Sequence, residues 1–334
     1  MSFTNYLSLI LNKQLLSIRE VSHFNNCTIS HVAEGIIEIT PSAVSNESTA
    51  YIYSCGIHGN ETAPIEIVND LLSDIATGKI QIHHPLLIIF GHLPAMRKST
   101  RFIQDNLNRM FSDEFLSYPD NDVEAPRAKL IQKEIARFYH QYSNHYKVHY
   151  DLHTAIRPSI YRRFAVYPYL KSGRNISKRQ LQLFSTMGIE AVLFMHKRAT
   201  TLSFYSSDVH GADAFTLELG KVEKFGENRR DDFSKAEGVL RALISNTKFD
   251  FEQKLPVLCQ VKKELIRHEK NYQFNISDDT ANFTSYRRGD VLASDSVETY
   301  TVQEDGEMIA FPNGRVKVGQ RSGLILTTTK LENL

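Results

Sequence analysis

The chain has 334 residues, of which 42% are hydrophobic and 23% charged, as is typical of a globular protein that can bury a large core. Its 39 Lys and Arg residues against 38 Asp and Glu residues leave a formal net charge of +1. Because that balance creates no overall field to attract nucleic acid or an anionic membrane, we expect neither as a partner.

The first residues and the cysteines favour a cytoplasmic protein. The segment 1–17 has no basic stretch before its apolar patch and no small-residue cleavage site after it, so we expect no signal peptide. No apolar run approaches the length that a bilayer requires. Cys27, Cys55 and Cys259 are widely separated and lack metal-ligand spacing. We therefore predict reduced thiols and a cytoplasmic location.

Strand-like and helix-like segments alternate from about residue 30 to residue 220. Apolar β-branched and aromatic runs predict strands at 50–57, 85–94, 146–154, 190–196 and 211–222. Apolar residues at helical spacing predict helices at 62–78, 125–142 and 178–188, followed by one at about 233–245. This alternation is typical of an α/β fold with a mostly parallel or mixed sheet and helices on both faces.

The pattern changes after about residue 250. Short β-rich runs are separated there by turn signals such as "RRGD", "EDGE" and "FPNGR", without a convincing long helix. We place a domain boundary near residue 248. It divides the chain into an α/β domain, 1–248, which carries the motifs described next, and a smaller β-rich C-terminal domain, 249–334.

The stretch "CGIHGNETAP", residues 55–64, lies between a predicted buried strand and a predicted helix. Ligands of open α/β sheets usually bind in the crevice at the carboxyl ends of the strands, and His58 and Glu61 are placed to point into it. A His and a Glu three residues apart are weak evidence alone, because 13 histidines give on the order of one such pair by chance. An ordinary turn histidine is the alternative.

His153 ends a separate predicted strand in the stretch "YDLHT". Two histidines and a carboxylate, with a fourth position left for water, form a catalytic zinc site. Asp151 lies two residues earlier on the same strand and faces the same side, where it can support a histidine ligand. His153 taken singly is more often a structural residue than a ligand.

Glu218 alternates with Leu217 and Leu219 in the stretch "TLELG". One interpretation is that this side chain faces solvent from a half-exposed strand. At the carboxyl end of a buried parallel strand, however, an ionised side chain needs a cleft, a metal or a partner. A glutamate beside a catalytic metal is the usual general base of metal-assisted hydrolysis.

Arg101, Asn108 and Arg109 lie in "STRFIQDNLNRMF", which we predict to be a loop, and Arg157 lies in "HTAIRPS". An arginine fork binds a carboxylate through two hydrogen bonds, and an asparagine amide adds a donor beside it. Each of these residues taken alone is also consistent with solvated surface.

The motifs "GIHGNETAP", "RFIQDNLNRMF", "DLHTAIRPS" and "FTLELGK", in this order, resemble those of succinylglutamate desuccinylases, in the aspartoacylase branch of the zinc carboxypeptidase-like family. The resemblance covers nearly the whole chain, including "FPNGRVKVGQRSGLIL" in the tail. It implies a zinc carboxypeptidase-like fold with one Zn²⁺ per chain. The implied zinc ligands are His58, Glu61 and His153.

The same resemblance implies roles for the other candidates. Glu218 is the implied catalytic carboxylate, and Arg101 is implied to polarise the scissile carbonyl. Asn108 and Arg109 are implied to hold a carboxylate of the substrate. The motif does not fix the role of Arg157.

The expected reaction is hydrolysis of N-succinyl-L-glutamate to succinate and L-glutamate in arginine catabolism by the succinyl route. Its substrate is a small molecule with several carboxylates, which suits a site rich in arginine. Deacylation of another N-acyl acidic amino acid, such as N-acetylaspartate, is the nearest alternative. A catalytically silent binding protein on the same fold is another, and a peptide-cleaving carboxypeptidase is a third. Nothing in the sequence predicts an oligomeric state.

Overall fold

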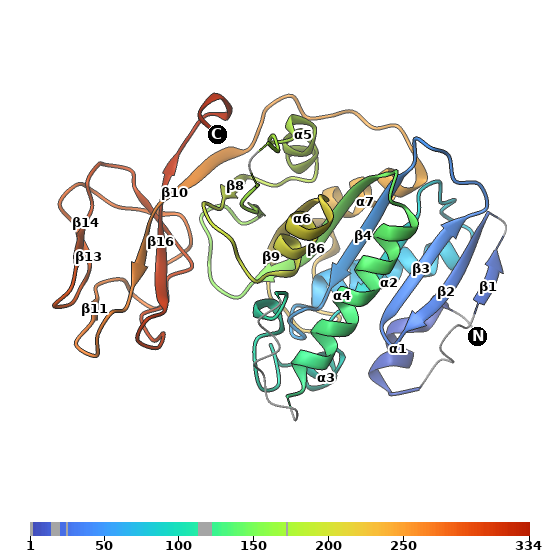
Figure 1. Cartoon of the computed structure of the whole chain (residues 1–334), viewed down its shortest axis with the longest axis horizontal. Coiled ribbons are helices and arrows are strands. Elements are labelled where there is room, and N and C mark those ends of the chain that lie inside the picture. Colours follow the sequence, from blue (N-terminus) through green and yellow to red (C-terminus); the bar gives the residue numbers. More distant parts are fainter. Residues whose placement is uncertain (1–2, 15–20, 25, 113–121, 172) are drawn as a thin grey trace.

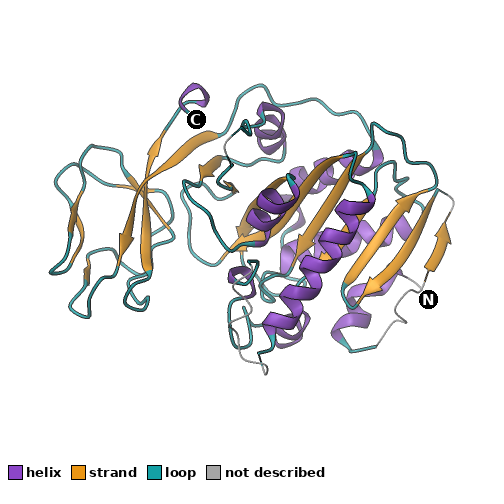
Figure 2. Ribbon diagram, viewed as in Figure 1, coloured by secondary structure: helices purple, strands orange, loops and turns teal. Residues whose placement is uncertain are grey.

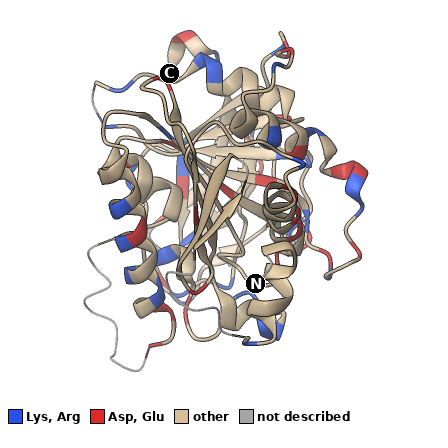
Figure 3. Ribbon diagram, turned by 90° about the vertical axis from the view of Figure 1, so that its right-hand side faces the viewer, with Lys and Arg blue, Asp and Glu red and all other residues tan. Residues whose placement is uncertain are grey.

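The computed structural model describes residues 3–14, 21–24, 26–112, 122–171 and 173–334. Its α/β part is a sheet covered by helices on both faces, and a smaller β part lies beside it (Figures 1 and 2). This architecture confirms the predicted fold class. Lys, Arg, Asp and Glu are interspersed over the face shown in Figure 3, in keeping with the small net charge.

The large sheet is mixed and has the strand order β1-β2-β3-β5-β4-β6-β9-β7-β8-β10-β16-β15-β12. Strands β4, β5, β6 and β9 run parallel to their neighbours in that group, whereas β7 is antiparallel to β9. The α/β strands are β1 (Val21–Phe24), β2 (Cys27–Ala33), β3 (Ile36–Pro41), β4 (Thr49–Cys55), β5 (Leu86–Phe90), β6 (Tyr146–Ala155), β7 (Phe164–Tyr167), β8 (Ala191–Phe194) and β9 (Asp213–Lys221).

Two separate apolar layers hold the helices against this sheet. One layer packs α1, α2, α5 and α7, and the other packs α4 and α6. The helices are α1 (Tyr6–Leu11), α2 (Thr62–Ala76), α3 (Leu93–Lys98), α4 (Glu124–Gln141), α5 (Lys178–Thr186), α6 (Leu202–His210) and α7 (Ser234–Ser245). The central strand β4 is buried along nearly its whole length because helices cover both of its faces.

The C-terminal part continues the large sheet. Strand β10 (Val257–Ile266) pairs parallel with β8 and antiparallel with β16 (Arg321–Thr328), so it joins the α/β part to the β part. The remaining strands are β11 (Gln273–Phe274), β12 (Thr284–Ser285), β13 (Val291–Ser294), β14 (Thr299–Thr301) and β15 (Met308–Ala310). Strands β11, β13 and β14 form a second, three-stranded sheet. No described α-helix follows α7.

Several sequence predictions need correction. The strand expected over 85–94 ends at Phe90, and the chain then turns into α3, with His92 as its N-cap. The sequence analysis did not identify helix α6, strand β7 or the antiparallel strands β1 to β3. Among the described residues, no helix combines the length and the hydropathy that a membrane crossing requires. All three cysteines are free and buried.

Candidate active site

The loop between β4 and α2 carries His58 and Glu61, and its glycines allow it to pack closely. Gly56 has a φ of +62°, a left-handed conformation that favours glycine. A Cβ at Gly59 would lie 2.2 Å from the backbone carbon of Ala95 in α3. The glycines therefore let this loop fold down onto α3 and direct both polar side chains into the molecule.

His58, Glu61 and His153 meet at the carboxyl ends of β4 and β6. One potential ligand atom from each lies within 4.8 Å of the other two, and all three residues are buried. His58 Nδ1 is 2.8 Å from Glu61 Oε1, yet this contact lacks hydrogen-bond geometry. His153 Nδ1 lies 2.8 Å from Glu61 Oε2. The sequence argument that brought these three side chains to one edge of the sheet agrees with their positions.

The second nitrogen of each imidazole faces an oxygen. His58 Nε2 lies 3.0 Å from Asn106 Oδ1, and His153 Nε2 lies 3.0 Å from Asp151 Oδ2. These acceptors favour a proton on Nε2 and leave the Nδ1 lone pairs directed toward Glu61. Asp151 thus lies where the strand pattern placed it, whereas the sequence analysis missed Asn106.

The electrostatics of the three residues are tightly linked. Burial raises the pKa of the Glu61 carboxyl, but His58 and His153 together hold that pKa well below its ordinary value. Burial lowers the pKa of His153, but the carboxylates of Asp151 and Glu61 raise it well above its ordinary value. The pKa of His58 is lowered, chiefly by burial. The charges of these three side chains thus depend on one another.

Glu218 on β9 stands beside His153 of β6 in the parallel register. Its Oε2 is shielded from solvent and has no hydrogen-bond partner in the described part of the chain. Burial, followed by the nearby charge of Glu61, raises the pKa of Glu218 to about 7. The alternative that this carboxylate faces open solvent does not fit such a position.

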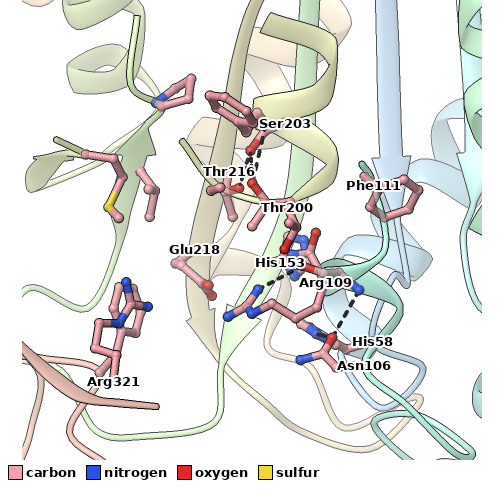
Figure 4. A pocket seen from close by; sticks show the side chains of 18 of the residues that line it. His58, Asn106, Arg109, Phe111, His153, Thr200, Ser203, Thr216, Glu218 and Arg321 are labelled. Carbon is pink, nitrogen blue, oxygen red and sulfur yellow. Dashed lines mark hydrogen bonds between the residues drawn. The ribbon is translucent and has the colours of Figure 1, made fainter. Parts of the chain in front are cut away.

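Glu218 and the three clustered residues line one large cavity of about 1290 Å³. Figure 4 shows His58, His153 and Glu218 from close by, with Arg109 and Asn106 near His58 and with Arg321 on the far side. Residues of the C-terminal part complete the wall: Asn282, Phe311, Pro312, Asn313, Val316, Gln320 and Arg321. The β-rich tail therefore borders the cavity, a point that the sequence left open.

The loop after α3 supplies further polar groups. Arg101 Nη1 donates to Glu61 Oε1 over 2.7 Å. Asn106 Oδ1 accepts the backbone N–H of Asn108 and so caps the short 3₁₀ turn Leu107–Arg109. An asparagine that accepts an N–H two residues later is a common turn motif, so "NLN" was a usable signal for this residue.

Asn108 and Arg109 differ in how firmly they are held. The Asn108 side chain is buried, and its Oδ1 accepts the backbone N–H of Leu202 at the start of α6. Arg109 is exposed, lines the cavity and donates from Nη1 to the Asn108 carbonyl. Arg157 borders the same cavity, and its Nη1 donates to the backbone carbonyl of Asp278. All four sequence-predicted polar candidates, including Arg101, thus border one space.

Comparison with known proteins identifies the family. Residues 47–244 match the succinylglutamate desuccinylase/aspartoacylase catalytic domain, and residues 256–329 match the AstE/AspA barrel-sandwich hybrid domain. The chain belongs to the succinylglutamate desuccinylase/aspartoacylase family. This membership confirms the resemblance seen in the sequence motifs.

Members of this family resemble the chain over nearly its full length. The succinylglutamate desuccinylase of Pseudoalteromonas atlantica is 40% identical over 315 residues, which cover 92% of this chain and 89% of the relative. The crystal structure of the succinylglutamate desuccinylase from Chromobacterium violaceum has a TM-score of 0.85, 33% identity and 98% coverage of both chains. That of the Vibrio cholerae protein has a TM-score of 0.89, 30% identity and coverage of 97% and 94%.

Proposed function

We propose that this chain is a zinc-dependent amide hydrolase that converts N-succinyl-L-glutamate and water into succinate and L-glutamate. Its relatives named succinylglutamate desuccinylase support this substrate. The observation that carries the proposal is the convergence of His58, Glu61 and His153 beside the carboxylate of Glu218, whose Oε2 has no hydrogen-bond partner among the described residues. The family implies that the reaction completes arginine breakdown by the succinyl route in the cytoplasm.

The donor set suits one zinc ion per chain. Two imidazole nitrogens and one carboxylate are the protein ligands of a known class of catalytic zinc sites. The contact between His58 Nδ1 and Glu61 Oε1 is short but not a hydrogen bond, as expected when two lone pairs face a common point. Asn106 and Asp151 orient the two rings from behind, as outer partners of histidine ligands do.

The roles of the reacting groups follow from this arrangement. When bound, zinc supplies Lewis-acid polarisation of the amide carbonyl and makes a water molecule more acidic. Glu218 takes a proton from the attacking water as its oxygen bonds to the carbonyl carbon, and passes that proton to the departing nitrogen as the C–N bond breaks. Burial raises the pKa of this carboxyl above its ordinary value, which suits both transfers. Arg101 stabilises the charge that develops on the carbonyl oxygen.

The cavity also suits the charge of the substrate. N-succinylglutamate carries three carboxylates at neutral pH, and the net charge of the whole chain is only +1. In our proposal, Asn108 and Arg109 hold one carboxylate through an amide donor and a guanidinium fork. Arg157 is a further candidate for carboxylate binding, because it borders the same cavity.

A parallel assay tests the substrate assignment. Zinc-loaded protein is offered N-succinylglutamate, N-acetylaspartate and a short peptide, and the free amino acid released is measured. We expect turnover of N-succinylglutamate to exceed the other two clearly. Preference for N-acetylaspartate would favour the aspartoacylase reaction, and comparable turnover of all three would remove the assignment. No turnover by zinc-loaded protein would favour the silent binding protein.

Metal analysis tests the ligand assignment independently of activity. His153→Ala should retain zinc far less well than the wild-type protein during dialysis against a chelator. His268→Ala is the matched control, because His268 lies in the C-terminal part and does not line the cavity. Full zinc retention by His153→Ala would place the third ligand elsewhere.

A further inference from the structure

The cavity gathers positive charge that the chain as a whole does not carry. Six Lys or Arg side chains line it, against four carboxylates, while the formal net charge of the chain is +1. Some of these cations already have a close carboxylate. Arg101 lies 2.7 Å from Glu61, and Arg198 lies 3.0 Å from Asp208. The cations to explain are those that lack a close carboxylate of their own.

Arg321 is one of these cations, and it comes from the C-terminal part. It is the first residue of β16, its side chain is 31% exposed, and it lies across the cavity from Arg109 in Figure 4. Among the described residues the only hydrogen bond of its side chain runs from Nη1 to Glu264 Oε1, at a long 3.5 Å. Lys197 contacts the other oxygen of Glu264 at 2.5 Å. Two cations thus share one carboxylate, and one positive charge is left in excess.

Arg109 is the second such cation. Its side chain donates to the Asn108 carbonyl and has no carboxylate within ion-pair distance in the described part of the chain. The pKa of Arg109 is lowered, first by desolvation and then by the charges of Arg321 and Arg101. Like charges that face a shared cavity destabilise one another until an anion binds between or beside them. The cavity therefore offers a cation that can bind an anion on the side of Arg109 and another on the side of Arg321.

We propose that Arg321 binds the substrate carboxylate at the end opposite to the one held by Asn108 and Arg109. The inference rests on the proposed function and deepens it. N-succinylglutamate carries carboxylates on both sides of its amide, and Glu218 lies between Arg109 and Arg321 in Figure 4. With the amide at Glu218, the two halves of the substrate extend toward opposite walls. The C-terminal part then supplies a residue that determines specificity.

Kinetics with matched substrates test this assignment. Wild type, Arg321→Gln and Arg109→Gln are assayed with N-succinylglutamate and with three analogues, each having one carboxylate converted to an amide. Arg321→Gln should raise KM for N-succinylglutamate about 10- to 100-fold, as expected for loss of a charge-assisted hydrogen bond. On the analogue that lacks the carboxylate bound by Arg321, the KM of Arg321→Gln should equal that of the wild type. The KM of Arg109→Gln should equal that of the wild type on a different analogue, one that lacks a carboxylate from the other half of the substrate.

Product binding gives a second readout. Calorimetric titration with succinate and with L-glutamate should show that Arg321→Gln weakens the binding of one product and Arg109→Gln that of the other. Arg288→Gln is the control, since Arg288 is exposed in the same part of the chain and does not line the cavity. It should behave as wild type. Arg321→Lys, which keeps the charge, should fall between wild type and Arg321→Gln.

The outcomes separate the two levels of the argument. If wild type turns over N-succinylglutamate but Arg321→Gln has the same KM, or loses equally on all four compounds, the role of Arg321 is overturned and the proposed function stands. If both variants equal the wild type on the same analogue, the two arginines bind the same carboxylate, and the role proposed for Arg321 is likewise overturned. No turnover by the wild-type protein would overturn the proposed function and this inference together. Zinc content and melting temperature show whether each variant is folded.

Discussion

The hydroxyl of Ser54 donates a 2.6 Å hydrogen bond to Oδ1 of Asp151 in the interior of the sheet, where both side chains are fully buried. The Ser54 oxygen also lies 2.7 Å from His149 Nε2, and His149 Nδ1 lies 2.8 Å from Ser206 Oγ on α6. Burial lowers the pKa of His149 to about 4, so this ring is neutral and can donate at one nitrogen and accept at the other. The chain of contacts ends at the carboxylate that orients His153.

We therefore predict that Ser54→Ala weakens zinc binding although Ser54 touches no zinc ligand. Loss of the hydroxyl leaves Asp151 one donor short and removes the partner of His149 Nε2, so His153 is oriented less firmly. Partners behind metal ligands typically contribute about 10- to 100-fold in metal affinity, and the lower end is expected here. Competition with a chromogenic chelator measures the change. Ser245→Ala, at the end of α7, should leave zinc affinity unchanged, and equal affinity of both variants would contradict the prediction.

A second prediction concerns Glu218. Glu218→Gln keeps the shape of the side chain but removes its basicity, so turnover should fall by a factor on the order of 10² or more while zinc stays bound. Turnover assays and metal analysis on the same samples measure the two effects. Near-normal turnover with a full zinc content would assign the proton transfer to another group.

The pH dependence of the wild-type protein gives a third prediction. Burial and Glu61 raise the pKa of Glu218 from 4.5 to about 7, and only the ionised carboxylate can accept a proton. Activity should therefore rise with pH through an acidic limb. Because a bound cation favours the ionised form, the limb should lie above 4.5 and no higher than about 7. A profile of kcat/KM against pH that stays flat across this interval would argue against Glu218 as the base.

The sequence revealed most where local pattern decides the structure. Helices α2, α4, α5 and α7 carry strong apolar periodicity, and each was predicted to within a few residues. Helix α6 was missed because "LSFYSSDVH" buries serines as well as apolar residues, which weakens the periodic signal. Strand β5 was predicted too long, since an apolar run alone does not distinguish a strand from the short helix α3 that follows it.

In the candidate site, too, the sequence predicted what local pattern decides and missed what long-range strand pairing decides. His58, Glu61, His153 and Glu218 could be brought together from the sequence because strand ends in a parallel sheet share an edge. Arg321 could not, because pairing of β10 with β8 and β16 depends on contacts far apart in the chain. The same pairing carries the large sheet past residue 248, and the domain boundary there stays a prediction.

A fourth prediction concerns the loop that carries Arg101. Glu124 Oε1 accepts the backbone N–H groups of Ile103 and Gln104 and lies 2.8 Å from His92 Nε2, with Glu124 fully buried. Glu124→Gln retains the size of the side chain but loses a charged acceptor. Hydrogen bonds to charged groups contribute about 1.5 to 3 kcal/mol, so unfolding free energy in urea at pH 7 should fall by about that amount.

The effect of Glu124→Gln should also depend on pH. Burial raises the pKa of the Glu124 carboxyl, but the backbone N–H groups and His92 lower it below its ordinary value of 4.5. The stabilisation by the carboxylate is thus fully present above the pKa of the unfolded chain and is lost as pH falls through the lowered value. The difference between variant and wild type should shrink when unfolding is measured at progressively lower pH. A constant difference would show that the charge of Glu124 is not what matters.

The last prediction separates the roles of Arg101 and Arg109. Arg101 lies against Glu61 at the cluster, where it can meet the carbonyl oxygen as negative charge develops, so Arg101→Ala should lower kcat with little change in KM. Arg109 binds a carboxylate in our proposal, and an ammonium cannot reproduce its planar fork. Arg109→Lys should therefore raise KM, with a loss of about 1.5 to 3 kcal/mol in transition-state binding. Steady-state kinetics of both variants with N-succinylglutamate measure the split, and zinc content is checked because Arg101 touches a proposed ligand. A KM effect from Arg101→Ala, together with a pure kcat effect from Arg109→Lys, would exchange the two assignments.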